Sequence, residues 1–310
     1  MLDEVLPCFV QIATTVSIYE QVVIVCKNAE QTRALFGDVP THNFRFVECD
    51  SNDTWSRDHG GIVIEENSQL VLLDFIFNGW GLKFAADKDN LITGKMVDAG
   101  VFNTGCRHGG IVLEGGGIES DGLGTLLVTS ECLLSPNRNP HLSKGEIEEI
   151  LKKLFGLNRV LWLNHGYLAG DDTDSHIDTL ARFCNADTIA YVKCDNPDDE
   201  HFESLLLMEK ELQAFHTAAG KPYNLAALPW PDPCFDTDGN RLPATYANFL
   251  VINGAVLVPV YGVKQDEAAL ELFKALFPGR TIHGINCRSL IEQHGSLHCV
   301  TMQFPAGALS

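Results

Sequence analysis

The sequence predicts a mixed α/β fold in which one small unit of strands and a helix repeats around a central axis. Pairs of strand-like segments recur at intervals of roughly 65 residues, and most pairs are followed by a helix-like segment and a short apolar strand. Polar clusters stand where several pairs begin, which is where a radial fold brings side chains together. No low-complexity linker divides the chain, so we expect one catalytic domain over residues 1–310.

The first part of the chain is predicted to contain two helices and two strands. Apolar residues near positions 3–19 have the spacing of an amphipathic helix. The segments QVVIVCK (21–27) and FRFVE (44–48) are typical of buried strands, and we expect a short helix between them.

Four later pairs of strand-like segments are expected to form hairpins. The last pair turns at Asn253-Gly254, a dipeptide that favours a two-residue hairpin loop. The four pairs lie at residues 61–77, 111–129, 177–193 and 246–261.

A helix and then a single strand follow three of these pairs. Ser143 and Glu146 have the spacing of a capping box at the start of the first helix, and Pro278-Gly279 ends the last one. The helices are predicted at residues 143–155, 200–218 and 265–277, and the single strands at residues 159–163, 224–228 and 280–285.

Two segments depart from the repeat. The stretch GWGLKFAADKDN (79–90) is predicted to be a loop. Residues 297–304 (LHCVTMQF) are predicted to form a final strand that pairs with the N-terminal part of the chain and closes a ring.

Composition argues against several classes of function. The formal charge of -19 repels nucleic-acid phosphates and anionic lipid, and it attracts small cations. The ten cysteines include no Cys-x-x-Cys pair, so we expect neither a zinc site nor a disulfide framework. No secretion signal or bilayer-length apolar run is visible. We therefore expect a cytoplasmic protein that binds neither nucleic acid nor membrane, with homo-oligomerisation left open.

Cys299 and His176 are the first candidates for chemistry. A cysteine on a strand is more often a buried structural thiol, but two histidines and a Gly-Ser loop precede Cys299 and would lower its pKa. His176 and Asp178 would lie on the same face of a strand. An imidazole beside a carboxylate suits either a general acid/base or two ligands of a divalent metal.

Two further carboxylates, Asp58 and Glu114, extend this candidate site. Asp58 lies in DTWSRDHGG, and Glu114 precedes three glycines in LEGGGIESDG. Each has an ordinary alternative role, because Asp58 could pair with Arg57 and the glycines could only permit a tight bend. Together with Asp178 they would place three carboxylates near one thiol. Since unpaired carboxylates are costly to bury, the sequence favours a cationic substrate.

Five segments carry a resemblance to a known family. They are TWSRDHGGI, VLEGGGIESDGLGTLLVTSECLLSPNRNP, GDDTDSHIDTLARF, YANFLVINGAVLVPVYG and HGSLHCVTMQFP. In this order they resemble the agmatine deiminase family, also called the Porphyromonas-type peptidylarginine deiminase family. The resemblance implies a pentein-type α/β propeller, with five ββαβ-like blades around a pseudo-fivefold axis and the active site at its centre. It implies no metal and no organic cofactor.

The resemblance also implies roles for the candidate residues. Cys299 matches the nucleophile of the family's GxxHC motif, and His176 matches the general acid/base of its HxD motif. Asp178, Asp58 and Glu114 match carboxylates that bind the guanidinium group or assist catalysis. The implied reaction converts agmatine to N-carbamoylputrescine and ammonia through a covalent thiouronium on the cysteine, a step of polyamine and putrescine synthesis.

Three more residues are candidate contacts to the substrate. Trp55 lies in the same motif as Asp58. Asp172 and Asp174 precede His176, and acids there would attract the amine of agmatine while repelling the carboxylate of free arginine. Either aspartate could instead form an Asx-turn, as could Asp171.

Three alternatives to agmatine hydrolysis stay open at this point. The same chemistry could act on peptidyl-arginine or another guanidino compound. A metal-dependent reaction that releases urea could use His176, Asp178 and Asp174 as ligands. A non-catalytic binder of small cations is the third alternative.

The chain departs from the family's pattern in two places. The family's RDxGP becomes Arg57-Asp58-His59-Gly60-Gly61, so the rigid proline is replaced. Family members also usually carry an upstream segment with a Trp-Pro strand, whereas this chain opens with MLDEVLPCFV. We expect that strand to be missing, and it would be the natural partner of residues 297–304.

Overall fold

The computed structural model describes residues 2–310, and within them the strands form five separate sheets. One sheet pairs β1 (Val22–Cys26) with β2 (Phe44–Glu48) in parallel. Each of the other four sheets extends an antiparallel hairpin by a third strand that runs parallel to the second. The four sheets are β3 (Ile62–Glu66), β4 (Gln69–Ile76) and β5 (Gly105–Val112); β6 (Ile118–Ser120), β7 (Thr125–Thr129) and β8 (Arg159–Leu163); β9 (Ala181–Asn185), β10 (Thr188–Val192) and β11 (Asn224–Leu228); and β12 (Leu250–Ile252), β13 (Ala255–Val260) and β14 (Thr281–Asn286).

Helices connect the second strand to the third in these sheets. Ser143 caps α7 as the sequence predicts, because its side chain accepts the Glu146 N–H and the Glu146 carboxylate accepts the Ser143 N–H at 2.8 Å. The longer helices are α1 (Leu2–Ser17), α7 (Lys144–Phe155), α8 (Phe202–Ala214) and α9 (Asp266–Leu276). The shorter ones are α2 (Ala29–Ala34), α3 (Ser56–His59), α4 (Gly79–Leu82), α5 (Ile92–Asp98), α6 (Ser130–Leu133) and α10 (Arg288–Ile291).

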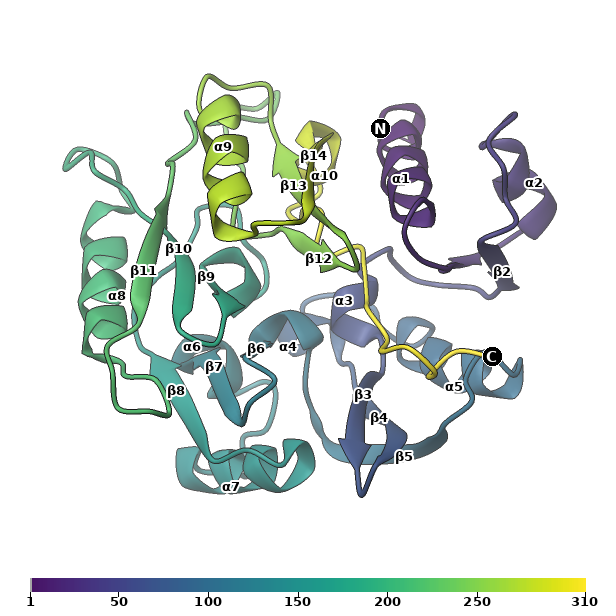
Figure 1. Cartoon of the computed structure of the whole chain (residues 1–310), viewed down its shortest axis with the longest axis horizontal. Helices are drawn as coiled ribbons and strands as arrows, with labels where there is room; N and C mark the ends of the chain where they lie inside the picture. Colours follow the sequence, from purple (N-terminus) through teal and green to yellow (C-terminus); the bar gives the residue numbers. More distant parts are fainter. Residues whose placement is uncertain (1) are drawn as a thin grey trace.

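The five sheets follow one another in chain order around the molecule (Figure 1). The view starts with β2 at the upper right, continues through β3–β5 and β6–β8 below and β9–β11 on the left, and reaches β12–β14 at the top. The short helices α3 and α4 lie near the middle of this view. The mixed α/β class and the repeat of hairpin, connection and single strand are confirmed.

Two predicted strands are wrong where the candidate site residues lie. Residues 297–304 contain no strand, and Cys299 lies in a turn. Its carbonyl oxygen accepts the Arg57 N–H at 3.0 Å, and the His298 N–H bonds to Asn248 at 2.8 Å, so loops take up the backbone groups that a strand would pair. The predicted strand from residue 177 begins only at Ala181, because residues 177–179 form a 3-10 turn.

The segment between β4 and β5 is more regular than the sequence suggests. The predicted loop at 79–90 contains α4 and enters a 3-10 turn at Asp89–Leu91, and then α5 and the unpredicted β5 follow. β5 has the sequence GCRHGGIV, whose three glycines and mostly exposed side chains hide the apolar alternation of a strand.

Buried apolar side chains form separate clusters in the interior of the described chain. The largest buried cluster extends from Val5 in α1 through β9, β10 and β13 to Leu297. A second cluster packs β6–β8 against α7 and β4. In the described part of the chain, no helix has the length and apolar character needed to cross a membrane.

Candidate active site

The five predicted catalytic residues lie in turns and short helices next to the sheets. Their side chains are almost excluded from solvent, with exposed fractions between 0 and 6%. Such burial lowers the local dielectric and strengthens every charge interaction among them. The five residues are Asp58, Glu114, His176, Asp178 and Cys299.

His176 lies between two carboxylates. Its Nε2 is 2.9 Å from Glu114 Oε2, and its Nδ1 is 3.5 Å from Asp58 Oδ1. Because an ionised carboxylate can only accept, Nε2 carries a proton toward Glu114. Nδ1 is buried and has no hydrogen-bond partner among the described residues. Burial would lower the pKa of His176, but the charge of Asp58 and the bond to Glu114 raise it well above its ordinary value.

Glu114 is held by Arg138 on its other side. The guanidinium Nε of Arg138 lies 3.1 Å from Oε1 and 2.9 Å from Oε2, and the side chain of Arg138 is only 1% exposed. Burial would raise the pKa of Glu114, but His176 and then Arg138 lower it below its ordinary value. The expectation of an unpaired carboxylate at Glu114 is therefore wrong, because Arg138 supplies a cation.

Asp58 is fixed by two donors. Its Oδ1 accepts the Gly116 N–H at 3.0 Å, and its Oδ2 accepts the indole N–H of Trp80 at 2.9 Å. Burial raises the pKa of Asp58, although His176 opposes this effect. A Cβ atom at residue 116 would lie 2.5 Å from His176 Nδ1 and 2.6 Å from Asp58 Oδ1, so only glycine fits between them.

One carboxylate oxygen of Asp178 accepts a hydrogen bond, and the other accepts none from the described residues. Its Oδ2 accepts the Nδ1–H of His298 at 2.7 Å, while the Nε2 of His298 accepts from Arg182 at 3.1 Å. Burial and the charge of Arg182 hold the pKa of His298 well below its ordinary value, so this histidine is neutral. Within residues 2–310, the buried Oδ1 of Asp178 has no hydrogen-bond partner. Burial raises the pKa of Asp178 to about 7.

Cys299 is surrounded by aromatic side chains and by the side-chain amide of Asn248. Its Sγ is 3.3 Å from Asn248 Oδ1, and it packs with Trp55, Phe77 and Trp80. Burial, followed by the charges of two nearby carboxylates, raises the pKa of the Cys299 thiol well above its ordinary value. The prediction that its histidine neighbours lower this pKa is wrong, because the adjacent histidine is neutral.

The aspartates that precede His176 have separate environments. Asp171 forms a turn by accepting from Thr173 Oγ1 at 2.6 Å and from the backbone of residue 175 at 2.8 Å. Asp174 is ion-paired with Arg138 and Lys83, each at 2.6 Å.

Asp172 lies beside Asp174 in this loop. Its carbonyl oxygen accepts from Lys83 at 2.7 Å, and its carboxylate is 3.8 Å from His294 Nδ1. Asp174 is therefore connected to the buried group through Arg138, whereas Asp172 contacts Lys83 and His294, whose side chains are partly exposed.

The structure adds four residues that the sequence analysis did not assign to the site. Three of them hold a predicted residue in place, and the fourth places a second thiol beside His176 and Glu114. A buried carboxylate requires a cation or several donors, and this requirement is the signal that points to a partner such as an arginine in SPNRNP. The four residues are Trp80, Cys132, Arg138 and Asn248.

Known proteins are similar to this chain in sequence over nearly its whole length. A model of the family described as Porphyromonas-type peptidyl-arginine deiminase matches residues 1–305. A Marinomonas protein, provisionally named an agmatine deiminase, is 33% identical and covers 96% of this chain and 85% of its own length. A provisionally named agmatine deiminase of Legionella pneumophila is also 33% identical, over 98% of this chain and 87% of its own.

Solved structures are similar over nearly all of the chain. A Porphyromonas gingivalis protein, provisionally named an arginine deiminase, superposes with a TM-score of 0.98 at 50% identity, covering 100% of this chain and 92% of its own. A variant of the C. jejuni agmatine deiminase with substrate bound has a TM-score of 0.90 at 40% identity, covering 96% of this chain and 86% of its own.

The fold and the buried site of thiol, imidazole and carboxylates, taken with these matches, define an enzyme of the guanidino-modifying class. The chain belongs to the Porphyromonas-type peptidyl-arginine deiminase family. It is accordingly a hydrolase that acts on carbon–nitrogen bonds of linear amidines, and not a non-catalytic binder of cations.

Proposed function

We propose that this enzyme hydrolyses agmatine to N-carbamoylputrescine and ammonia. The observation that carries the proposal is the pair of buried carboxylates, Asp58 and Asp178, close to Cys299 and His176. Asp178 Oδ1 is an acceptor with no partner in the described chain, and Asp58 accepts from Gly116 and Trp80 with His176 as its nearby cation at 3.5 Å. A planar guanidinium cation supplies further donors and positive charge to these two buried carboxylates.

Binding of the cation prepares the nucleophile. The carboxylates hold the planar guanidinium and direct its central carbon toward Cys299 Sγ, while the aromatic face of Trp55 lines the same side. The positive charge of the substrate offsets the two carboxylates that raise the pKa of the thiol. The thiolate therefore forms when substrate is present.

The reaction then proceeds in two halves. The thiolate adds to the guanidinium carbon, and the His176 imidazolium protonates the departing nitrogen, which leaves as ammonia. A thiouronium remains on Cys299. The now neutral His176 takes a proton from water as the water oxygen bonds to the same carbon. The carbon–sulfur bond then breaks, the thiolate leaves, and the hydroxyl proton passes to solvent, which leaves the ureido product. Glu114 assists by orienting the imidazole through Nε2, so that Nδ1 faces the reacting atoms.

The far end of agmatine is an ammonium, and we assign it to Asp172 and Asp174. The ammonium of Lys83 already contacts Asp174 Oδ1 at 2.6 Å and the carbonyl of Asp172 at 2.7 Å. The ammonium of agmatine would take the place of Lys83 at these two acceptors, which disfavour a carboxylate. The assignment supports agmatine over free arginine.

The proposal also covers the arrangement of the sheets and the role of the enzyme in the cell. We propose that the sheets form the five blades of a pentein propeller, in one catalytic domain with a pseudo-fivefold axis through the site. The chain order of the sheets around the molecule supports it. A cytoplasmic role in polyamine and putrescine synthesis follows from the substrate.

A second candidate is peptidyl-arginine, which the description of the family favours. Ammonia release from agmatine, free arginine and a blocked peptidyl-arginine separates the two. We expect turnover of agmatine alone, and its complete loss in Cys299→Ala. Cys106→Ser, which changes an exposed thiol, is the matched control and should keep full turnover. Faster ammonia release from the blocked peptidyl-arginine than from agmatine would identify peptidyl-arginine as the substrate. Turnover by Cys299→Ala would refute the thiol mechanism.

A further inference from the structure

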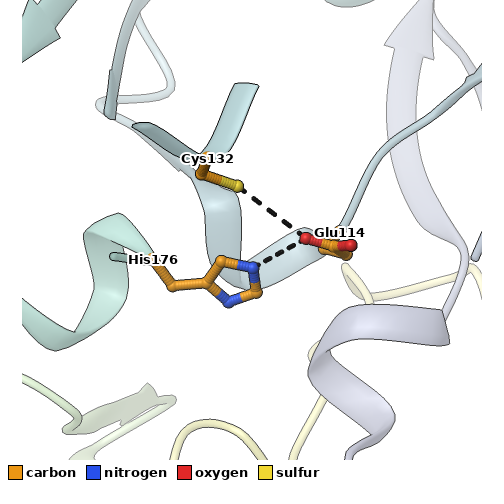
Figure 2. Close-up of side chains that lie close together, drawn as sticks. All are labelled: Glu114, Cys132 and His176. Carbon is orange, nitrogen blue, oxygen red and sulfur yellow. Dashed lines mark hydrogen bonds and ion pairs between the residues drawn. The ribbon is translucent and has the colours of Figure 1, made fainter. Parts of the chain in front are cut away.

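A second buried thiol lies on the opposite side of His176 from Asp58. Cys132 Sγ is 3.8 Å from Glu114 Oε2, the same oxygen that lies 2.9 Å from His176 Nε2. Figure 2 shows the three side chains pointing toward one another from three different segments. All three are buried, and the proposed reaction gives Cys132 no role.

The backbone around Cys132 keeps the thiol at this place. The residue lies in α6, whose start is capped by the Thr129 side chain, which accepts the Cys132 N–H. A Cβ atom at Gly117 would lie 3.1 Å from Sγ, so the absence of a side chain there lets the thiol pack closely against the backbone. The thiol is thus held beside the imidazole and the carboxylate.

Two of the three separations between the ligand atoms are close to those of a tetrahedral metal site. One nitrogen, one sulfur and one oxygen lie within 4.8 Å of one another. In a tetrahedral zinc site with bonds of about 2.0 to 2.3 Å, neighbouring ligand atoms are separated by about 3.3 to 3.5 Å. Two of the separations here are 2.9 and 3.8 Å, so shifts of a few tenths of an ångström bring these two pairs to zinc geometry.

We propose that Glu114, Cys132 and His176 form a binding site for a thiophilic divalent cation of the zinc class, and that this cation inhibits the enzyme. The ion forms one bond each to oxygen, sulfur and imidazole nitrogen, and a water molecule completes its coordination. The protons on Cys132 Sγ and His176 Nε2 are released to solvent. The inhibitory part rests on the proposed function, whereas the binding part does not.

Inhibition follows from the position of the ion. A cation on Nε2 draws electron density from the imidazole and weakens Nδ1 as a base. It also adds positive charge beside the carboxylates that receive the guanidinium, which repels the substrate. A thiol that takes no part in catalysis thereby gives the enzyme sensitivity to free zinc.

Cadmium binding tests the site without relying on activity. We would titrate Cd²⁺ into Cys299→Ala and into Cys299→Ala/Cys132→Ser, and record the near-ultraviolet absorption of the cadmium–thiolate bond. Removing the nucleophile excludes its own thiolate from the signal. We expect a saturable band in the first protein and a loss of affinity of at least about tenfold in the second. Equal bands in the two proteins would overturn the proposal.

Zinc inhibition of the intact enzyme tests the consequence. Steady-state turnover is measured with Zn²⁺ for the parent, Cys132→Ser, Cys132→Ala and the exposed-thiol control Cys106→Ser. We expect both Cys132 variants to need at least about tenfold more zinc for half inhibition, and the control to match the parent. Loss of inhibition in Cys106→Ser alone would overturn the proposal in favour of a surface thiol.

Failure of the proposal and failure of the proposed function remain distinguishable. An absent cadmium band with normal turnover of agmatine removes only the metal site. A cadmium band with turnover of a different guanidino substrate removes only the agmatine assignment.

Discussion

Replacement of Arg138 by methionine should destabilise the protein strongly, whereas the same replacement of Lys83 should not. Both cations pair with Asp174 at 2.6 Å, but their exposures differ. The Arg138 side chain is 1% exposed and also holds the fully buried Glu114, while the Lys83 side chain is 36% exposed. The two variants therefore compare the same kind of ion pair in the interior and at the surface.

The expected magnitudes follow from this difference. Breaking a buried pair leaves an uncompensated charge, which costs about 3 to 5 kcal/mol. An exposed pair contributes about 0 to 1 kcal/mol. Since a protein's total stability is typically about 5 to 15 kcal/mol, Arg138→Met should lose a large fraction of it.

Urea unfolding followed by tryptophan fluorescence at neutral pH measures both changes. We expect Arg138→Met to unfold at a much lower urea concentration than the parent, and Lys83→Met to unfold close to it. A difference between the two variants below about 1 kcal/mol would refute the reasoning, because it would mean that burial does not decide the strength of these pairs.

The effect of Arg138 should also depend on pH. The pKa of Glu114 is lowered in the folded protein, so its ion pair stabilises the fold above the unfolded value of about 4.3. That stabilisation is lost as the pH falls through the lowered folded value. The gap in stability between the parent and Arg138→Met should therefore narrow at acid pH.

Two further predictions concern the catalytic group. Gly116→Ala should abolish ammonia release, because the new methyl group would lie about 2.5 Å from both His176 Nδ1 and Asp58 Oδ1; Gly94→Ala, where nothing lies within 4 Å, is the control that should keep its turnover. Alkylation of Cys299 by iodoacetamide in the substrate-free enzyme, followed by mass spectrometry, should still accelerate above pH 9, because burial raises the pKa of its thiol. If the alkylation rate instead stops rising with pH below the ordinary thiol pKa of about 8.5, the raised pKa of Cys299 is contradicted.

Elements whose stabilising features are local could be predicted from the sequence. The capping box at Ser143 and the Asn253-Gly254 turn act within a few residues, and both are present as predicted. The strand expected at residues 297–304 failed because distant loops take up its backbone hydrogen bonds. β5 was missed because its glycine-rich sequence owes its strand form to pairing with β4.

The candidate site also contains residues that the sequence predicts and residues that only the structure reveals. The five buried candidates were found from motifs, but the partners that set their charge were not. Arg138 follows Glu114 by 24 positions and Arg182 precedes His298 by 116, so no local pattern joins either pair. The neutral state of His298 depends on its burial and on the charges of Arg182 and Arg57, which only the tertiary structure brings close to it.

The hydrogen bond from the Arg57 N–H to the Cys299 carbonyl joins two turns that are far apart in the chain. The proposed nucleophile, Cys299, therefore meets the turn that carries Asp58 only after the chain between them has folded. Recovery of turnover after unfolding should accordingly report the assembly of the segments from Arg57 to Cys299 and not that of any one sheet.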